Sequence, residues 1–586
     1  MSIYQKLPRI MVPKLDNTIE RYLEVMKAQY KFTTYSEIVY YTRIFARMEG
    51  IYFQNVLMEH SESNTNWAAK IWVNQSFLEN RISLLYTNET RGSVNKLNWS
   101  TTDQMLTAIS QYISTIINFW EDVRQERVPQ DYVGDMPQCM EQYKRIMGVH
   151  RRSLPKIDNW HSTSYSKYII VMVEGRMFQM RVYDNKEGRP YPRNEIKELL
   201  KKIISHSKDE DAQPEPVGTL TAMDRDNWFC IREEMSRSSI NKQSLSIIEQ
   251  SLFGLCIDET YPKPNNVFTQ TTLGDHRYDF KNFNRWYDLG LQCVFRKDGY
   301  FTWITEQSIY DGAIIPQPKE VVIEDSKEQS SQKCQNSDVK IINWDLSNTT
   351  KMNIERGKNK LINWWPNLDN HVFEFTDFGL EYLQKYDLHA NGLVQQAIVL
   401  AYYKLYNQLD SMCQPVSLRR YRSGRKEHPH IVTCENRKFV EAMENKNIIM
   451  EVKWERLEKA IQKHHSLIAD ASHLNHYFRG LMALNWIIEH EFIFSDFFLI
   501  RFWKCFSKPK VVVIYSDTQE PAISTGIPTY ESGHYIYFHP KKNSILFSIN
   551  TVLKSLEFKT SNRFASMLEL SLLEIKHLLE NRFRDI

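Results

Sequence analysis

Segments with helical periodicity alternate along this chain with segments that have the pattern of paired strands. Residues 104–122 place apolar side chains at helical spacing on one side. Residues 168–183 predict two strands joined at Glu174 and Gly175, a dipeptide suited to a tight hairpin turn. Because helices and strands alternate rather than segregate, the sequence predicts an α/β fold. A length of 586 residues exceeds what one core usually serves, so two domains are expected.

The same alternation continues to the end of the chain. Further helices are predicted over residues 194–205, 243–255, 393–406 and 562–580, and strands over 289–304, 510–516 and 534–549. Residues 316–341 are rich in Lys, Glu, Ser and Gln and nearly free of aromatic residues, which predicts a linker or an exposed insertion.

Composition excludes several classes of function. The net charge of +3 is too small to indicate a general nucleic-acid partner. The eight cysteines show no Cys-x-x-Cys spacing, so neither a metal site nor a redox motif is predicted, and a reducing compartment fits best. No apolar run approaches the roughly 18 residues that a transmembrane segment needs. The N-terminal residues lack an apolar signal core, so a cytoplasmic location is expected.

The segment from Arg285 to Gly312, RWYDLGLQCVFRKDGYFTWITEQSIYDG, combines paired strands with acidic residues at fixed positions. It resembles the active-site signature of the choline/carnitine acyltransferase family. That signature runs Arg, aromatic, any residue, Asp, an apolar strand, Asp-Gly or Asn-Gly, six residues, Glu-His, three residues and Glu-Gly. The agreeing positions are Arg285, Trp286, Asp288, Asp298, Gly299, Glu306 and Gly312. Gln307 stands in the position of the catalytic histidine, and Asp311 in that of the second glutamate.

Other segments resemble the same family in the same order. They are residues 7–22 (LPRIMVPKLDNTIERY), Leu220–Trp228 (LTAMDRDNW), residues 393–406 (LVQQAIVLAYYKLY) and Ser417–Arg425 (SLRRYRSGR). The resemblance covers nearly the whole chain, which is identified as a divergent member lacking the catalytic histidine. It implies two chloramphenicol-acetyltransferase-like α/β domains, residues 1–366 and 367–586, with a central tunnel at their interface.

The family resemblance also implies a reaction. Coenzyme A enters one end of the tunnel and carnitine or choline enters the other. A histidine takes the hydroxyl or thiol proton while a glutamate orients its ring. Gln307 has no basic nitrogen at neutral pH, and losing a positioned general base typically costs about 10²–10⁴-fold in rate. Asp311 is one methylene shorter than the glutamate and would have nothing basic to orient.

Residues that would contact the ligands differ from the family pattern as well. Ser524 and Thr525 match the Ser-Thr-Ser strand that stabilises the oxyanion, but Gly526 replaces the last serine. Asn475 stands at the arginine, and Lys426 at the threonine, that bind the carnitine carboxylate; asparagine there resembles the choline-using branch. Lys385 remains of the lysines that precede the coenzyme A helix.

Two functional hypotheses follow from these differences. The first is a catalytically impaired homologue that acts by binding an acyl-CoA, a carnitine-like or choline-like quaternary ammonium ligand, or a protein partner. The alternative is an active acyl-CoA-dependent O-acyltransferase with an unusual base, such as Asp311, and an altered acceptor. Outside this pattern, His464 and His465 are predicted to be solvated on a polar helix, and Cys413 to be a small buried residue.

Overall fold

The structure is a computed structural model that describes most of the chain. The described residues are 7–93, 97, 99–163, 165–184, 188–207, 214–259, 283–314, 335–364, 368–473, 478–491, 495–517, 522–526, 533–553 and 560–582.

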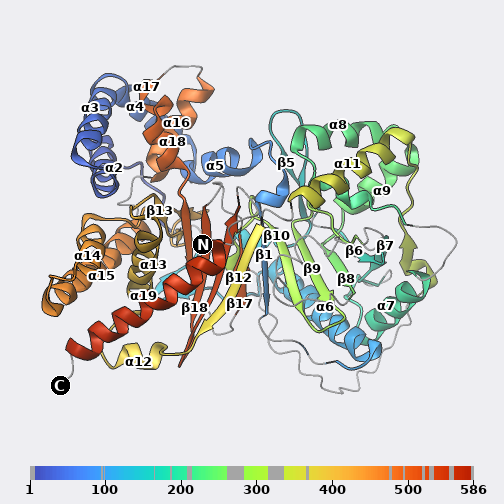
Figure 1. Ribbon diagram of the computed structural model, residues 1–586. Helices are drawn as coiled ribbons and strands as arrows, with labels where there is room; N and C mark the ends of the chain where they lie inside the picture. The colour runs from blue at the N-terminus through green and yellow to red at the C-terminus, as the bar shows by residue number, and fades with distance from the viewer. Residues whose placement is uncertain are drawn as a thin grey trace.

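An eight-stranded mixed sheet lies in one half of the molecule (Figure 1). Its order is β11 (Val339–Ile341), β7 (Arg176–Arg181), β6 (Tyr168–Val173), β8 (Gly254–Asp258), β9 (Leu291–Arg296), β10 (Phe301–Glu306), β1 (Asn88–Ser93) and β17 (Ala522–Thr525). The pairs β6–β8 and β8–β9 are parallel, and the other pairs are antiparallel.

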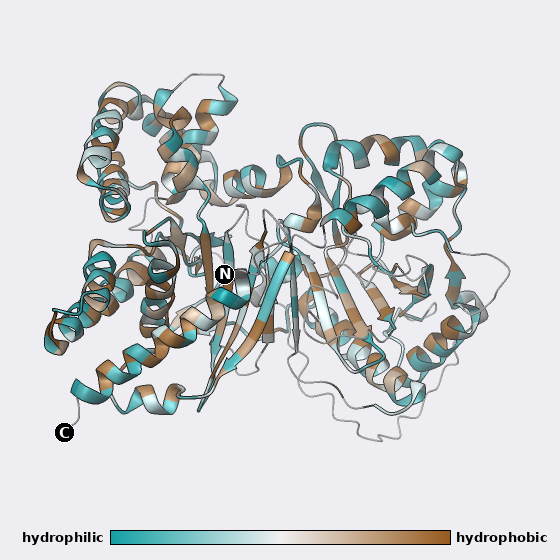
Figure 2. Ribbon diagram, in the orientation of Figure 1, coloured by the Kyte–Doolittle hydropathy of each residue, from teal (hydrophilic) through white to brown (hydrophobic). Residues whose placement is uncertain are grey.

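Helices cover both faces of this sheet. On one face lie α6 (Thr102–Arg124) and α7 (Arg193–Ser207), and on the other α8 (Arg225–Met235), α9 (Ser239–Glu249) and α11 (Asn348–Trp364). Because both faces are covered, every residue of β8, β9 and β10 is buried. Figure 2 accordingly shows strands with much hydrophobic colour between helices whose colour is mixed.

A five-stranded sheet forms the second half. Its order is β12 (Leu368–Phe375), β19 (Ile545–Val552), β18 (His534–Pro540), β16 (Val511–Tyr515) and β13 (Met412–Cys413). One face packs on α13 (Ala390–Tyr406), α14 (Cys434–Glu444), α15 (Met450–Ser472) and α19 (Thr560–Arg582), with α12 (Leu380–Gln384) at the side. The other face meets β17, where Ile523 packs against Leu546.

Helices from two segments far apart in the chain pack together in a further core. The N-terminal helices α2 (Leu15–Gln29), α3 (Phe32–Met48), α4 (Gly50–Ser63) and α5 (Trp67–Val73) share a core with α16 (Phe478–His490), α17 (Asp496–Leu499) and α18 (Arg501–Ser507) (Figure 1). Small hairpins complete the structure: β2 (Tyr132–Val133) with β3 (Met136–Pro137), β4 (Val149–Arg152) with β5 (Asn159–Ser162), and β14 (Val416–Ser417) with β15 (Lys426–Glu427). The division at residue 366 stays a prediction.

The predicted α/β class is confirmed. The predicted hairpin at Glu174 and Gly175 also forms. The φ angles of these two residues are 50° and 73°, and Gly175 adopts its positive φ without strain. The helix predicted over 243–255 is wrong at its end. It stops at Glu249, and residues from Gly254 instead form β8, paired on both sides. Most of the polar stretch 316–341 lies outside the described residues, while its last residues form β11 at the sheet edge.

The prediction of a solvated His464 is wrong, whereas that of a buried Cys413 is confirmed. His464 lies on the inner side of α15, where burial lowers the pKa of its imidazole to about 3.

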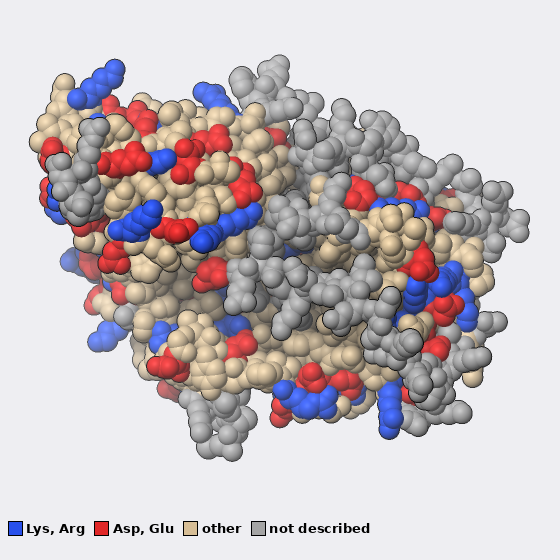
Figure 3. Space-filling view, turned by 90° about the horizontal axis from the view of Figure 1, so that it is seen from below, with Lys and Arg blue, Asp and Glu red and all other residues tan. Residues whose placement is uncertain are grey.

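Basic and acidic residues intermingle on the face seen in Figure 3. Among the helices that the structure describes, none is long and apolar enough to cross a membrane.

Candidate functional site

Gln307, in the position predicted for the catalytic base, lies at the point where the two sheets meet. It directly follows β10, which pairs with β1. Its side-chain amide donates a hydrogen bond from Nε2 to Oε2 of Glu89 at 2.8 Å, and its carbonyl accepts one from Nη2 of Arg425 at 2.7 Å. The amide is therefore engaged with a carboxylate that the sequence analysis did not identify.

Glu89 is a buried carboxylate on β1 whose two oxygens both accept hydrogen bonds. Oε1 accepts from Nε of Arg91 at 2.9 Å and from the hydroxyl of Ser524, and Oε2 accepts from Gln307. Burial acts to raise the pKa of Glu89, but the charges of Arg91 and Lys426 and these hydrogen bonds outweigh it and lower that pKa to about 2. Glu89 is therefore a charged, fully engaged anion at neutral pH.

Two glycines make room for this group. A Cβ atom on Gly312 would lie 2.7 Å from Cζ of Arg91, and one on Gly526 would lie 2.4 Å from Cε2 of Tyr535. The ring of Tyr535 thus occupies the space that a serine at position 526 would need. The hydroxyls of Tyr535 and Ser524 are 3.5 Å apart. Replacement of the last serine of Ser-Thr-Ser is therefore coupled to the packing of an aromatic ring.

Asp311 lies one turn further on, also buried, and is held from three directions. Nε2 of Gln142 donates to its Oδ2 at 3.0 Å, while Nε of Arg425 and Nζ of Lys426 lie 3.3 and 3.7 Å from its Oδ1. Burial acts to raise the pKa of Asp311, but Arg425 and Lys426 outweigh it and lower that pKa to about 2. Asp311 is therefore the centre of an ion-pair cluster.

The structure thus brings four of the predicted site residues into one polar network, in which Glu89 connects Gln307 to Ser524, and Arg425 and Lys426 reach Asp311. Thr525 pairs with Thr90 through the backbone, but its side chain is not described. Asn475 lies outside the described residues. Lys385 follows α12 and is exposed, away from this network.

Several residues of the active-site signature have structural roles. Both terminal nitrogens of Arg285 donate to the carboxylate of Asp258, at 2.6 and 3.1 Å. Asp288 accepts from Arg225 at 2.7 Å and from the indole of Trp228 at 2.6 Å, so the two matching segments that contain these residues are joined directly.

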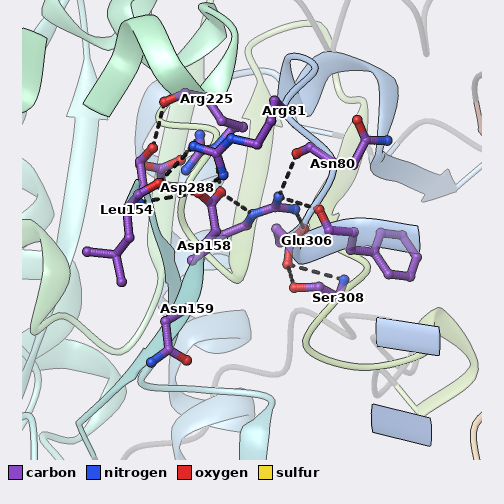
Figure 4. A network of polar contacts seen from close by, with 12 residues as sticks. Asn80, Arg81, Leu154, Asp158, Asn159, Arg225, Asp288, Glu306 and Ser308 are labelled. Atoms are coloured by element: carbon purple, nitrogen blue, oxygen red, sulfur yellow. Dashed lines mark hydrogen bonds and ion pairs between the residues drawn. The ribbon is translucent and has the colours of Figure 1, made fainter. Parts of the chain in front are cut away.

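The same buried network extends to the residue before Gln307 (Figure 4). Asp158 accepts from Arg81, Arg151 and Arg225 at 2.6–2.7 Å. Arg151 also donates to Glu306 at 3.1 Å. Since Glu306 precedes Gln307 in the chain, these paired charges hold the turn that presents the site.

A separate cavity of about 690 Å³ lies beside the N-terminus of α13. It is lined in part by Gln384, Asp387, His389 and Asn391, which flank the position of Lys385. Unpaired backbone N–H groups at a helix N-terminus favour anions, although His389 supplies no side-chain cap to α13. Over the described ranges, no cluster of three or more His, Cys, Asp or Glu side chains could hold a metal ion.

Sequence reasoning did not find Glu89, Arg91 and Tyr535. The one available signal was in β1, where Glu89 and Arg91 are two residues apart and therefore project from the same side of a strand. Opposite charges on one strand face indicate an internal pair. Nothing in the sequence showed that this face meets Gln307, more than two hundred residues away.

Comparisons with known proteins identify similar sequences and structures. A family model described as choline/carnitine O-acyltransferase matches residues 10–570. Human carnitine O-acetyltransferase is 25% identical over 99% of this chain and 94% of its own length. Mouse choline O-acetyltransferase is 25% identical over 78% of this chain and 74% of its own. A solved trichothecene 15-O-acetyltransferase from Fusarium sporotrichioides aligns with 86% of this chain and 93% of its own at 7% identity, with a TM-score of 0.39.

Proposed function

Because the chain belongs to the choline/carnitine O-acyltransferase family, we propose that it is a divergent member with impaired acyl transfer that acts by binding. The observation that carries this proposal is the engagement of Gln307 with Glu89. At the family's histidine position there is an amide without a basic nitrogen, and its donor group is already bound to a buried carboxylate.

Neither carboxylate of the site is a suitable replacement base. A general base works best with a pKa near the operating pH, and both Glu89 and Asp311 have a pKa of about 2. That is about five units too low at neutral pH, and each unit corresponds to about 1.4 kcal/mol. These values argue against the alternative of an active transferase that uses Asp311 as its base.

We place the retained ligand in the cavity beside α13. Its volume of about 690 Å³ suits a cofactor-sized ligand, and the first turn of α13 offers backbone donors to phosphate groups. Lys385, on the segment that borders the cavity, adds one cation. The proposed ligand class is therefore an acyl-CoA, while the quaternary ammonium ligand and the protein partner of the first hypothesis remain secondary candidates.

Two measurements on the purified chain test the proposal. Calorimetry with coenzyme A and acetyl-CoA should show binding that weakens in Lys385→Glu and not in the matched control Lys144→Glu, an exposed lysine remote from α13. A thiol-release assay with acetyl-CoA and either carnitine or choline should show no turnover above background.

The variant Gln307→His examines the site itself. We expect it to restore little transfer, because Gln142, Arg425 and Lys426 hold Asp311, and Glu89 would compete for the new imidazole N–H. Sustained turnover by the unaltered chain would refute impairment. The absence of coenzyme A binding by a folded chain would refute the ligand assignment.

A further inference from the structure

A second cavity of about 580 Å³ lies on the side of the eight-stranded sheet that carries α8 and α9. Its lining comes from the end of β4, from His161 on β5, from the C-terminal end of α8 and from one side of α9 with the residue that follows it. On α9, residues 242, 245, 246 and 249 follow helical spacing. In Figure 1, α8 and α9 lie beside each other there. Arg152 contributes from β4, next to Arg151 of the buried network but on the opposite face of the strand.

The carboxylates of this cavity are already paired with one arginine. Arg232 is buried, and its Nε donates to Oε1 of Glu249 at 2.8 Å while its Nη1 lies 3.2 Å from Oε1 of Glu233. Among the described residues that line the cavity, these two are the only carboxylates. Because both already contact Arg232, they do not neutralise the remaining cations of the cavity.

Three cations of the lining have no such partner. Within the part of the chain that the structure describes, Arg152, Arg237 and Lys242 form no ion pair with a carboxylate. Nε of Arg152 is moreover buried without any hydrogen-bond acceptor. A buried donor that lacks an acceptor is uncommon, and three cations that line one cavity favour a ligand that brings several anionic oxygens.

We propose that this cavity binds a small ligand with two or more neighbouring phosphate groups, such as a polyphosphate or a nucleotide. Arginine guanidinium groups match phosphate oxygens with two donors each, and Lys242 adds a point charge. The cavity has room for more than one phosphate. The proposal does not rest on the proposed function, since its residues belong to neither the Gln307 network nor the cavity beside α13.

Tripolyphosphate is the probe for a calorimetric titration of the full chain at low salt. We expect binding that weakens with rising salt, and a dissociation constant raised about tenfold in Arg237→Gln/Lys242→Gln, which lies within the range that two exposed charge interactions give. The matched control is Arg456→Gln/Lys459→Gln, which removes the same two side-chain types from α15. It should leave the constant within about twofold.

Arg237 and Lys242 are exposed, so their removal should not unfold the chain. Arg152→Gln then tests whether the buried guanidinium donor contributes to binding of tripolyphosphate. The melting temperature of this variant is measured in parallel to check that it folds. The proposal is overturned if the unaltered chain does not bind tripolyphosphate, or if both double variants weaken binding equally. It is also overturned if coenzyme A displaces the probe while Arg237→Gln/Lys242→Gln has no effect, since the phosphates would then lie beside α13.

Discussion

Removing the charge of Glu89 tests whether the network around Gln307 is the stable, ionised arrangement described above. In Glu89→Gln the amide can still accept from Ser524, but Arg91 loses its anionic partner. The pKa of Glu89 falls from an ordinary 4.5 to about 2 on folding. That shift corresponds to about 3 kcal/mol in favour of the charged folded state, similar to the cost of breaking a buried ion pair. We expect a loss of this size at pH 7, measured by urea unfolding.

The stability difference between Glu89→Gln and the unaltered chain should depend on pH in a defined direction. A carboxyl with a depressed folded pKa contributes stability above its unfolded pKa and loses that contribution as the pH falls toward the folded value. The gap between Glu89→Gln and the unaltered chain should therefore be largest above pH 5 and narrow as the pH falls from about 4.5 toward 2. Glu355→Gln, which breaks an exposed pair with Lys358, is the control and should change stability by less than about 0.5 kcal/mol. A loss below about 1 kcal/mol at pH 7 would refute the ionised network.

Two further predictions concern packing and a buried histidine. Gly526→Ser should lower the free energy of unfolding by about 1–3 kcal/mol because its Cβ would meet the ring of Tyr535, and the same serine should cost nothing more in a Tyr535→Ala background. Additive losses in the double variant would contradict this coupling. His464 has a folded pKa of about 3 against an ordinary 6.5, so the unfolded state takes up its proton first and stability falls as the pH drops below about 6.5. His464→Leu should therefore make the free energy of unfolding depend less on pH, by up to about 1.4 kcal/mol per pH unit. The free energy is measured by urea unfolding of the variant and of the unaltered chain between pH 7 and 5. Equal slopes of free energy against pH for the two proteins would contradict the prediction.

The sequence was sufficient for the fold class because strand and helix patterns are local. The hairpin at Glu174 and Gly175 depends on two adjacent residues, and α6 on apolar residues within one helix. It was insufficient at the end of α9, since a short apolar run fits either a buried strand or a helix until its pairing partners are known. The prediction that His464 is solvated was wrong for a related reason. Its neighbours in sequence are polar, but its position on α15 faces the core.

For the candidate site too, one part could be predicted from the sequence and another could not. Gln307, Asp311, Ser524 and Lys426 could be located from motif positions, and they do lie in one network. What they contact could not be derived, because Glu89 reaches them through the pairing of β1 with β10 and β17, strands far apart in the chain.

This pairing changes how the absence of the histidine should be understood. If Gln307 were an isolated change, the remaining site would be ready for a restored base. Instead, the Gln307 amide donates to Glu89, Glu89 is paired with Arg91, Arg91 packs against Gly312, and Tyr535 occupies the space beside Gly526. Contacts that depend on one another in this way are not additive, so reversing one leaves the others in place. Under the proposed function, acyl transfer would therefore return only if Glu89 and Arg91 changed together with Gln307, because their paired charges occupy the surroundings that an imidazole base would need.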